Sequence, residues 1–315
     1  MTAGCILFAS MNVTARFATS GVPWPLVACS RAVVGAMIAF AASRLRKKPL
    51  AGLGTSKMWA RSIFGTLALT CTFFAIGSKS LPLGDACTLF ALTPVLIAIL
   101  APRILGEATG PRAWFFVLLS TFGVVLVMRP PFLFAPVFGE DIPLGGHGRA
   151  SFPALVAILA AVFSSFAMMM LRRIGREEKQ PSVEAIVFHF SITGTIFLGL
   201  LSLATLHTVP VFDRKSVFAM MAAGTCAGFA QLAMTRAYAL ETAARIGAFS
   251  NLTVVLSAAA SMLVLSERLS LHSALGMALV ISGSILVSLD GARTKLRDFP
   301  PPEDALNKKI DSAVR

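Results

Sequence analysis

Charged residues are scarce in this chain. Only 14% of its 315 residues are Asp, Glu, Lys or Arg, whereas 56% are hydrophobic, and the mean hydropathy is +0.78. A soluble globular protein carries about 25% charged residues. The composition therefore excludes an ordinary soluble domain and predicts an all-α integral membrane protein.

Acidic residues are scarcer than basic ones. Fifteen Asp and Glu stand against 28 Lys and Arg, which gives a net charge of +13. In a soluble protein this excess would suggest binding to nucleic acid. In a membrane protein it is expected from the basic loops that orient the chain. We therefore expect the lipid bilayer, and no nucleic acid, as a partner.

Motifs for metal, redox or catalytic chemistry are missing. The five cysteines all fall inside apolar runs and form no C-x-x-C pair, so we interpret them as small buried hydrophobes. Neither H-E-x-x-H nor G-x-S-x-G occurs. The LGD at 83–85 matches half of an aspartyl-protease signature, but a second intramembrane aspartate is missing. The sequence predicts no enzyme, no cofactor and no metal site, with an intramembrane enzyme as the less favoured alternative.

Long apolar runs, by contrast, fill most of the chain. A membrane-spanning helix needs about 20 mostly apolar residues. Asn12 and Arg16 weaken the first candidate, and Pro94 at the middle of the fourth predicts a kink. Ten segments qualify: 3–20, 24–43, 58–80, 86–102, 111–128, 152–171, 183–206, 216–238, 246–265 and 270–289.

The distribution of Lys and Arg predicts the orientation. With the N-terminus in the cytoplasm, 19 of them fall in inner segments and six in outer segments, while three lie within spans. Cytoplasmic segments carry the excess of Lys and Arg. Both termini of this multi-pass protein are therefore predicted to be cytoplasmic, in a membrane that the sequence does not identify. Interfacial anchors are expected at three helix ends, at Trp24, Trp59 and Trp114.

An internal repeat organises the chain. LTPVLIAILAPRILGE at 92–107 returns as LTVVLSAAASMLVLSE at 252–267, and 11 of the 36 positions from Leu92 to Val127 are identical to those 160 residues later. Five spans per copy is an odd number, so the second copy is predicted to be inverted, as in many secondary transporters. The predicted parts are a first five-helix unit (1–128), an outer linker (129–150), a second five-helix unit (151–289) and a disordered cytoplasmic tail (290–315).

Two tandem five-helix units, each closing its fourth helix with Leu-x-Glu at 105–107 and 265–267, resemble the EamA-type branch of the drug/metabolite transporter superfamily. The resemblance covers residues 2–289. GVVLVMRPPFLF (123–134) and GFAQLAMTRAYALETA (228–243) are most similar to the G subgroup of solute carrier family 35. This resemblance implies the ten-helix fold with two inverted repeats, a cavity lined by helices 1, 3, 4, 6, 8 and 9, and transport of a small polar solute. Amino acids, nucleotide sugars, carboxylates and drug-like molecules are the solute classes it implies.

Polar side chains within the spans are the candidates for binding solute, because they are costly in hydrocarbon unless they face a cavity or each other. On the third and eighth spans, an offset of 159 residues pairs Thr72 with Gln231 and Lys79 with Tyr238, so the two polar stripes are repeat mates. The predicted substrate-binding residues are Asn12, Arg16, Thr72, Lys79, Thr93, Gln231, Tyr238 and Asn251. Cations with no carboxylate at similar depth favour an anionic solute.

Several charged residues have a second interpretation. Arg16 and Lys79 lie near helix ends and could extend to lipid headgroups instead. For Arg61, one turn from the inner surface, this placement is the favoured one. Arg31 is as well explained by a structural hydrogen bond between helices as by a ligand. Glu107 and Glu267 are expected near the N-termini of the fifth and tenth spans, where the helix dipole favours them.

Two other features are interpreted as structural. His189, alone in the seventh span, is expected to be a hydrogen-bonded core histidine rather than a proton relay. Gly224 and Gly228 form a G-x-x-x-G that predicts close helix packing.

The function predicted from these features is a transporter that moves a small polar, anionic organic solute by alternating access. The only plausible embedded carboxylate, Asp85, resembles a helix N-cap, which favours uniport or exchange over proton symport. A channel is disfavoured because it needs a ring of equivalent groups. A non-transporting scaffold or receptor with the same fold stays open, as does a homodimer.

Overall fold

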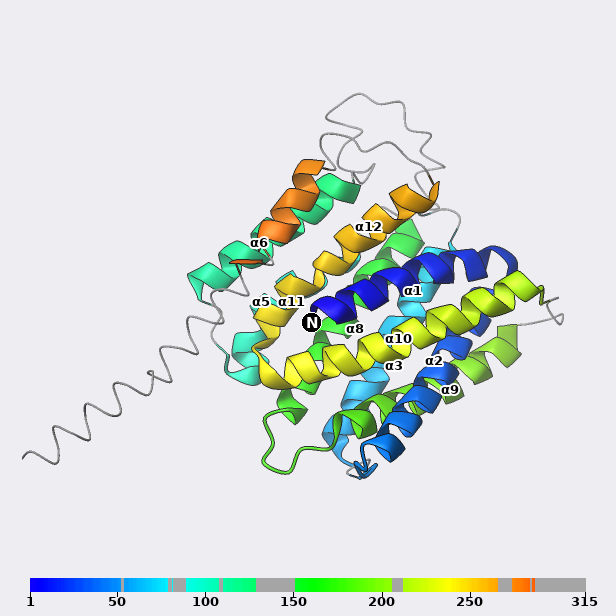
Figure 1. Cartoon of the computed structure of the whole chain (residues 1–315). Coiled ribbons are helices and arrows are strands. Elements are labelled where there is room, and N and C mark those ends of the chain that lie inside the picture. The colour runs from blue at the N-terminus through cyan, green and yellow to red at the C-terminus, as the bar shows by residue number, and fades with distance from the viewer. Residues whose placement is uncertain are drawn as a thin grey trace, which may run out of the picture.

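Every regular element that the structure describes is a helix (Figure 1). The structure is a computed structural model, and it describes residues 1–51, 54–78, 81, 89–107, 110–128, 151–205, 212–265, 274–283 and 285–286. The predicted linker 129–150 and tail 290–315 lie outside these ranges, as do Lys79, Asp85 and Glu267.

The helices follow the apolar segments of the sequence. Their bounds are α1 Thr2–Gly21, α2 Trp24–Leu45, α3 Ser56–Gly77, α5 Thr93–Leu105, α6 Pro111–Met128, α8 Ser151–Ile174, α9 Val183–Thr205, α10 Arg214–Leu240, α11 Ala243–Ser250 and α12 Leu252–Leu265. A further helix includes Ala274–Gly283. The three tryptophans stand in the first turns of α2, α3 and α6, at the helix ends where they were predicted.

Local sequence signals account for several of these helix ends. The Thr55 side chain accepts a hydrogen bond from the Met58 amide at the start of α3, and Asp213 accepts one from the Ser216 amide at the start of α10. Such caps satisfy amide groups that have no partner within the helix. Gly106 ends α5 in the left-handed conformation with φ of 65°, which glycine adopts without steric cost.

Five of the described helices are long and apolar enough to cross a membrane: α2, α3, α8 from Phe152 onward, α9 and α10. Their outward faces carry large apolar side chains, for example Leu45, Leu203 and Phe218, which are 85%, 78% and 75% exposed. Exposure of so much apolar surface would be unfavourable in water and is appropriate to lipid. The composition-based prediction of an all-helical membrane protein is confirmed at this level.

Helices that are distant in sequence pack together in a consistent pattern (Figure 1). α1 packs along α10, and α3 packs along α8. α2 packs against α9, α2 also contacts α10, and α3 contacts α9. α1 contacts α12, while α5 contacts α8. Nearly all of these contacts join the first half of the chain to the second, so the two halves share one core.

Two of the predicted spans contain a break in the helix. Pro94 is in the first turn of α5, where its missing N–H would have had no helical partner, and α5 is preceded by a turn at residues 91–92. The predicted mid-helix kink at Pro94 is therefore wrong. In the second half, Asn251 separates α11 from α12. The breaks at 91–92 and at 251 lie about one repeat offset apart.

Glycine allows α2 and α10 to approach closely. A Cβ atom placed on Gly224 would lie 2.7 Å from Val34 Cβ, and one on Gly228 would lie 2.7 Å from Ile38 Cδ1. Real Cβ atoms essentially never come so close to another heavy atom. The predicted packing role of this G-x-x-x-G pair is confirmed.

Replacing Gly224 with Ala should therefore destabilise the bundle. The added methyl group would collide with the branched Cβ of Val34, which cannot rotate away, and overpacking of this kind costs about 1–3 kcal/mol. Thermal unfolding of the purified protein in detergent should show a lower midpoint. Gly199→Ala is the matched control, because its Cβ would meet only Cys29 Sγ at 3.9 Å. Equal midpoints for the two variants would contradict this account of the packing.

Candidate functional site

The centre of the bundle, where α2, α9 and α10 meet, is lined largely by small residues. A Cβ atom on Gly35 of α2 would lie 3.1 Å from Ser191 Oγ on α9, and a Cβ atom on Gly228 of α10 would lie 3.5 Å from Gly35 Cα. Ala32, Gly194 and Ala227 complete this small-residue surface. Three backbones thus come close together with little side-chain volume between them.

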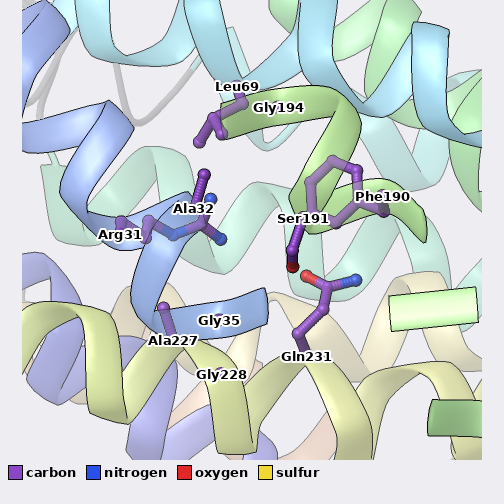
Figure 2. A pocket seen from close by; sticks show the side chains of 10 residues that line it. All are labelled: Arg31, Ala32, Gly35, Leu69, Phe190, Ser191, Gly194, Ala227, Gly228 and Gln231. Carbon is purple, nitrogen blue, oxygen red and sulfur yellow. The ribbon is translucent and has the colours of Figure 1, made fainter. Parts of the chain in front are cut away.

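A small cavity remains at this crossing. Its polar lining comes from Arg31, Ser191 and Gln231, and its larger apolar walls are Leu69 and Phe190 (Figure 2). The volume open to the centre of a water-sized sphere is about 10 Å³, which is enough for roughly one water molecule. In this conformation the centre is closed around a polar space too small for an organic solute.

Arg31 contributes a buried positive charge to this cavity. Its residue is 9% exposed, and Figure 2 shows the side chain extending toward the middle of the lining residues. Nε donates a hydrogen bond to Met11 Sδ at 3.3 Å, and a thioether sulfur is a weak acceptor. Among the described residues no carboxylate forms an ion pair with Arg31.

Gln231, a predicted site residue, lies on the opposite wall. It is 5% exposed, and Nε2 has no hydrogen-bond partner among the described residues. Figure 2 shows its amide group and the Ser191 hydroxyl pointing toward one another. A buried donor without a partner costs about 1–3 kcal/mol. The amide is thus positioned to gain free energy from any acceptor that enters the cavity.

Phe190 separates this cavity from a second buried cation. The Arg61 guanidinium lies over the Phe190 ring, with Cζ 4.5 Å from the ring centroid. Arg61 is 1% exposed and is the largest fully buried side chain among the described residues. The prediction that Arg61 extends to the headgroups is wrong, because the side chain turns inward toward α9 instead of along the bundle surface.

His189 is a hydrogen-bonded core residue, as the sequence predicts. Its Nδ1 lies 2.7 Å from the Ser62 hydroxyl, and the Trp59 ring packs edge-on against the imidazole with centroids 4.7 Å apart. These partners occupy the one ring nitrogen and the ring face that a proton relay would need.

The other predicted site residues lie outside the lining of the central cavity. Asn12 Nδ2 donates to Ser257 Oγ at 3.0 Å, and Asn251 Nδ2 donates to Ser120 Oγ at 3.1 Å. Thr93 Oγ1 makes a long 3.5 Å hydrogen bond to the Ala161 carbonyl. In this conformation the two asparagines link helices of opposite halves or neighbouring spans, because α1 contacts α12 and Asn251 adjoins α6.

Tyr238 lies at one end of the bundle rather than at its centre. It is 2% exposed and packs in an apolar cluster with Met58, Ile97 and Ile174. Thr72 is half-buried on α3. The side chain of Arg16 and all of Lys79 lie outside the described residues, so they stay predictions.

The end of the bundle that holds Leu45, Ser56, Leu105 and Ile174 is rich in ion pairs, and we call it the basic end. Arg46 contacts Glu184 at 3.2 Å, and Lys57 forms an ion pair with Glu177. Both pairs join the first half of the chain to the second. Among the described residues, every ion pair between the halves lies at this end.

Glu107 is the most connected acid at the basic end. Its side chain is 7% exposed, and Oε1 accepts a hydrogen bond from Arg172 Nε at 2.6 Å and lies 3.7 Å from Arg176 NH2. Oε2 accepts a hydrogen bond at 3.1 Å from the amide of Ala243, the first residue of α11. The predicted association of Glu107 with a helix N-terminus is right in kind, but this hydrogen bond reaches α11 and not α6, because the chain folds α11 back against the end of α5.

Comparison with known proteins follows from this architecture. The model of the EamA-like transporter family matches the chain twice, at residues 1–129 and 151–289. A solved crystal structure superposes with a TM-score of 0.74 at 21% sequence identity and covers 91% of this chain and 96% of that one, which shows a shared fold.

Curated relatives extend over nearly the whole chain. The pseudopaline exporter of Pseudomonas aeruginosa is 25% identical over 288 residues, covering 89% of each protein. The riboflavin transporter of Rhizobium johnstonii is 25% identical over 283 residues, which is 90% of this chain and 87% of that protein. Human solute carrier family 35 member G1 is 27% identical over 202 residues, covering 62% of this chain and 52% of that protein. With two family matches that together span most of its length, the chain belongs to the EamA-like transporter family.

Proposed function

We propose that this protein is a multi-pass transporter that moves a small polar organic anion through the centre of its helical bundle by alternating access. The observation that carries the proposal is the central cavity. It holds the Arg31 cation and the unpartnered Gln231 amide, with no paired carboxylate among the described residues. Burying a cation without a counter-charge is costly, so an anion that enters would be bound favourably.

Membership of the family supports transport but not the choice of solute. Two relatives of similar identity carry the names of different molecules, pseudopaline and riboflavin. A shared fold can serve many substrates. The solute class is therefore inferred from the charge and polarity of this chain's own cavity.

Alternating access requires two units that can move against each other, and we propose that residues 1–128 and 151–289 are those units in opposite orientation. The helix contacts support this: exchanging α1 with α8, α2 with α9, α3 with α10 and α5 with α12 turns the α1–α10 contact into α8–α3 and the α1–α12 contact into α8–α5. The same exchange turns the α2–α10 contact into α9–α3. The paired helix breaks at 91–92 and 251 fit this scheme, as do the two matches to the family model.

The distribution of contacts along the bundle supports a closed basic end, which we place at the cytoplasm. Ion pairs between the halves and the apolar cluster around Tyr238, Met58 and Ile97 seal that end. Near the opposite end, a cavity of about 310 Å³ is lined by residues that include Val22, Trp24 and Gly77. Access to Arg31 would thus come from the end opposite the ion pairs, and release to the cytoplasm would require the Glu107 contacts to break.

Gln231→Ala tests the cavity as the path of the solute. The variant should reduce transport at least tenfold while the protein still folds, because a lost hydrogen bond to a charged group is worth about 1.5–3 kcal/mol. Untargeted metabolite profiling of cells with and without the wild-type protein identifies the transported anion, and flux of that anion in proteoliposomes gives the rate. Thr225→Ala, on the exposed face of the same helix, is the control. Wild-type flux in Gln231→Ala would remove this residue from the path, and no solute difference for the wild type would favour a non-transporting scaffold.

Glu107→Gln tests the basic end as a gate. The amide keeps an acceptor for the Ala243 N–H but loses the charge that pairs with Arg172, so the closed end should open more often. Every 1.4 kcal/mol or so lost from the closed state is a tenfold change in the equilibrium. The readout is maleimide labelling of Cys5, which is buried near this end against the Phe249 carbonyl, in a background with the other cysteines replaced by alanine.

Labelling of Cys5 should rise at least several-fold in Glu107→Gln and stay at the wild-type rate in Glu178→Gln, which changes an exposed acid at the same end. An unchanged labelling rate in a folded Glu107→Gln variant would mean that these contacts do not close the path.

A further inference from the structure

The inference concerns Arg61 and rests on the proposed function. Arg61 stands on the far side of Phe190 from the central cavity and nearer the basic end, since α3 begins only five residues earlier at Ser56. Its position in the fold is therefore between the cavity and the end through which the proposed path leaves.

The Arg61 guanidinium is buried without a partner for two of its nitrogen atoms. Nε and NH1 have no hydrogen-bond partner, and no carboxylate of the described residues forms an ion pair with Arg61. The effective cost of taking a cation out of water in a protein is several kcal/mol. An arrangement this costly needs a compensating interaction.

The contact with Phe190 compensates only in part. A cation over an aromatic ring gains about 0.5–2 kcal/mol. The remainder is uncompensated in the described structure, and an anion placed beside the guanidinium would supply it.

The local sequence keeps room for this guanidinium. A Cβ atom on Gly65 would lie 2.2 Å from Arg61 NH1 and 2.8 Å from Phe190 Cε2. Any other residue at position 65 would displace the charged group from the Phe190 ring. Glycine here therefore holds open the space that Arg61 occupies.

A second unpartnered donor lies beside it. Thr66 is 3% exposed, its hydroxyl has no hydrogen-bond partner, and Oγ1 would be 3.7 Å from a Cβ atom on Gly194, a residue of the central cavity wall. Thr66 adjoins Gly65, against which the guanidinium rests. Two guanidinium nitrogens and one hydroxyl thus face the neighbourhood of Phe190 and Gly194 with their hydrogen-bonding capacity unused.

We propose that Arg61 and Thr66 form a second anion-binding station, specific for a carboxylate group, on the basic-end side of Phe190. The solute anion passes from Arg31 and Gln231 to this station when the Phe190 ring moves aside. A carboxylate matches the donors present, because its two oxygens accept the hydrogen bonds that Arg61 and Thr66 can give. A phosphate group would leave further oxygens without donors among the described residues.

The test compares Arg61→Met with Arg44→Met in the full-length purified protein. Arg44 is the matched control, because it also lies over a phenylalanine ring, 5.1 Å from Phe40, but is exposed. Thermal unfolding is measured without solute and with succinate or its uncharged counterpart succinamide, at equal ionic strength. Succinate, but not succinamide, should raise the midpoint of the wild type and of Arg44→Met.

Arg61→Met should unfold at a higher temperature than the wild type without solute, since a buried uncompensated charge is gone, and should lose most of the succinate-induced shift. A lower midpoint, or failure to fold, would show that Arg61 has a structural partner and would overturn the proposal. An undiminished succinate shift in Arg61→Met, or no succinate shift in the wild type, would also overturn it.

Arg61→Lys separates carboxylate recognition from charge alone. It keeps the cation but loses the planar donor set, so its succinate shift should fall between those of the wild type and Arg61→Met. A shift equal to that of the wild type would overturn the role given to the guanidinium nitrogens.

Flux of the identified solute distinguishes this proposal from the proposed function. If wild-type protein transports and Arg61→Met transports equally well, only the second station is wrong. If wild-type protein moves no solute, transport itself is wrong.

Discussion

The structure depends on the close crossing of α2, α9 and α10, which small residues make possible. Gly35 and Gly228 bring backbones so near to one another that a single methyl group would crowd them. Because water is largely excluded from such a crossing, charges and amides inside it are poorly solvated. Arg31, Arg61 and Gln231 are therefore held in a state in which any suitable anion is bound more strongly than it would be at a surface.

The two ends of the bundle are built differently, and this difference gives the path a direction. Carboxylates paired with arginine or lysine join the halves at the basic end, whereas the centre holds cations without such partners among the described residues. Ion pairs of this kind lose most of their value once the two partners separate, so they favour one of two discrete arrangements. Glu107 adds a hydrogen bond to the first amide of α11, which ties a short helix beside a break to the same contact.

Much of the fold could be predicted from the sequence, because apolar runs and repeated segments are visible in one dimension. The helix ends at Trp24 and Trp59, the packing of Gly224 and the hydrogen-bonded state of His189 follow from local patterns. The depth of Arg61 does not, because it depends on Gly65 and Phe190, which lie on different helices. Phe190 and Ser191 were missed as cavity residues for the same reason: in an apolar span, an aromatic and a small hydroxyl are also typical of packing. Pro94 had two structural outcomes, a kink or a helix start, and the choice depended on the turn before it.

Tyr238 has a consequence for how motion in this protein could be observed. It is the only tyrosine in the chain, and it is enclosed by methionine and isoleucine side chains at the basic end. Biosynthetic incorporation of a fluorinated tyrosine would therefore place one fluorine nucleus at one defined position without any substitution in the sequence. Its magnetic resonance signal would shift whenever that apolar enclosure separates and admits water, and would so report the populations of the two states directly.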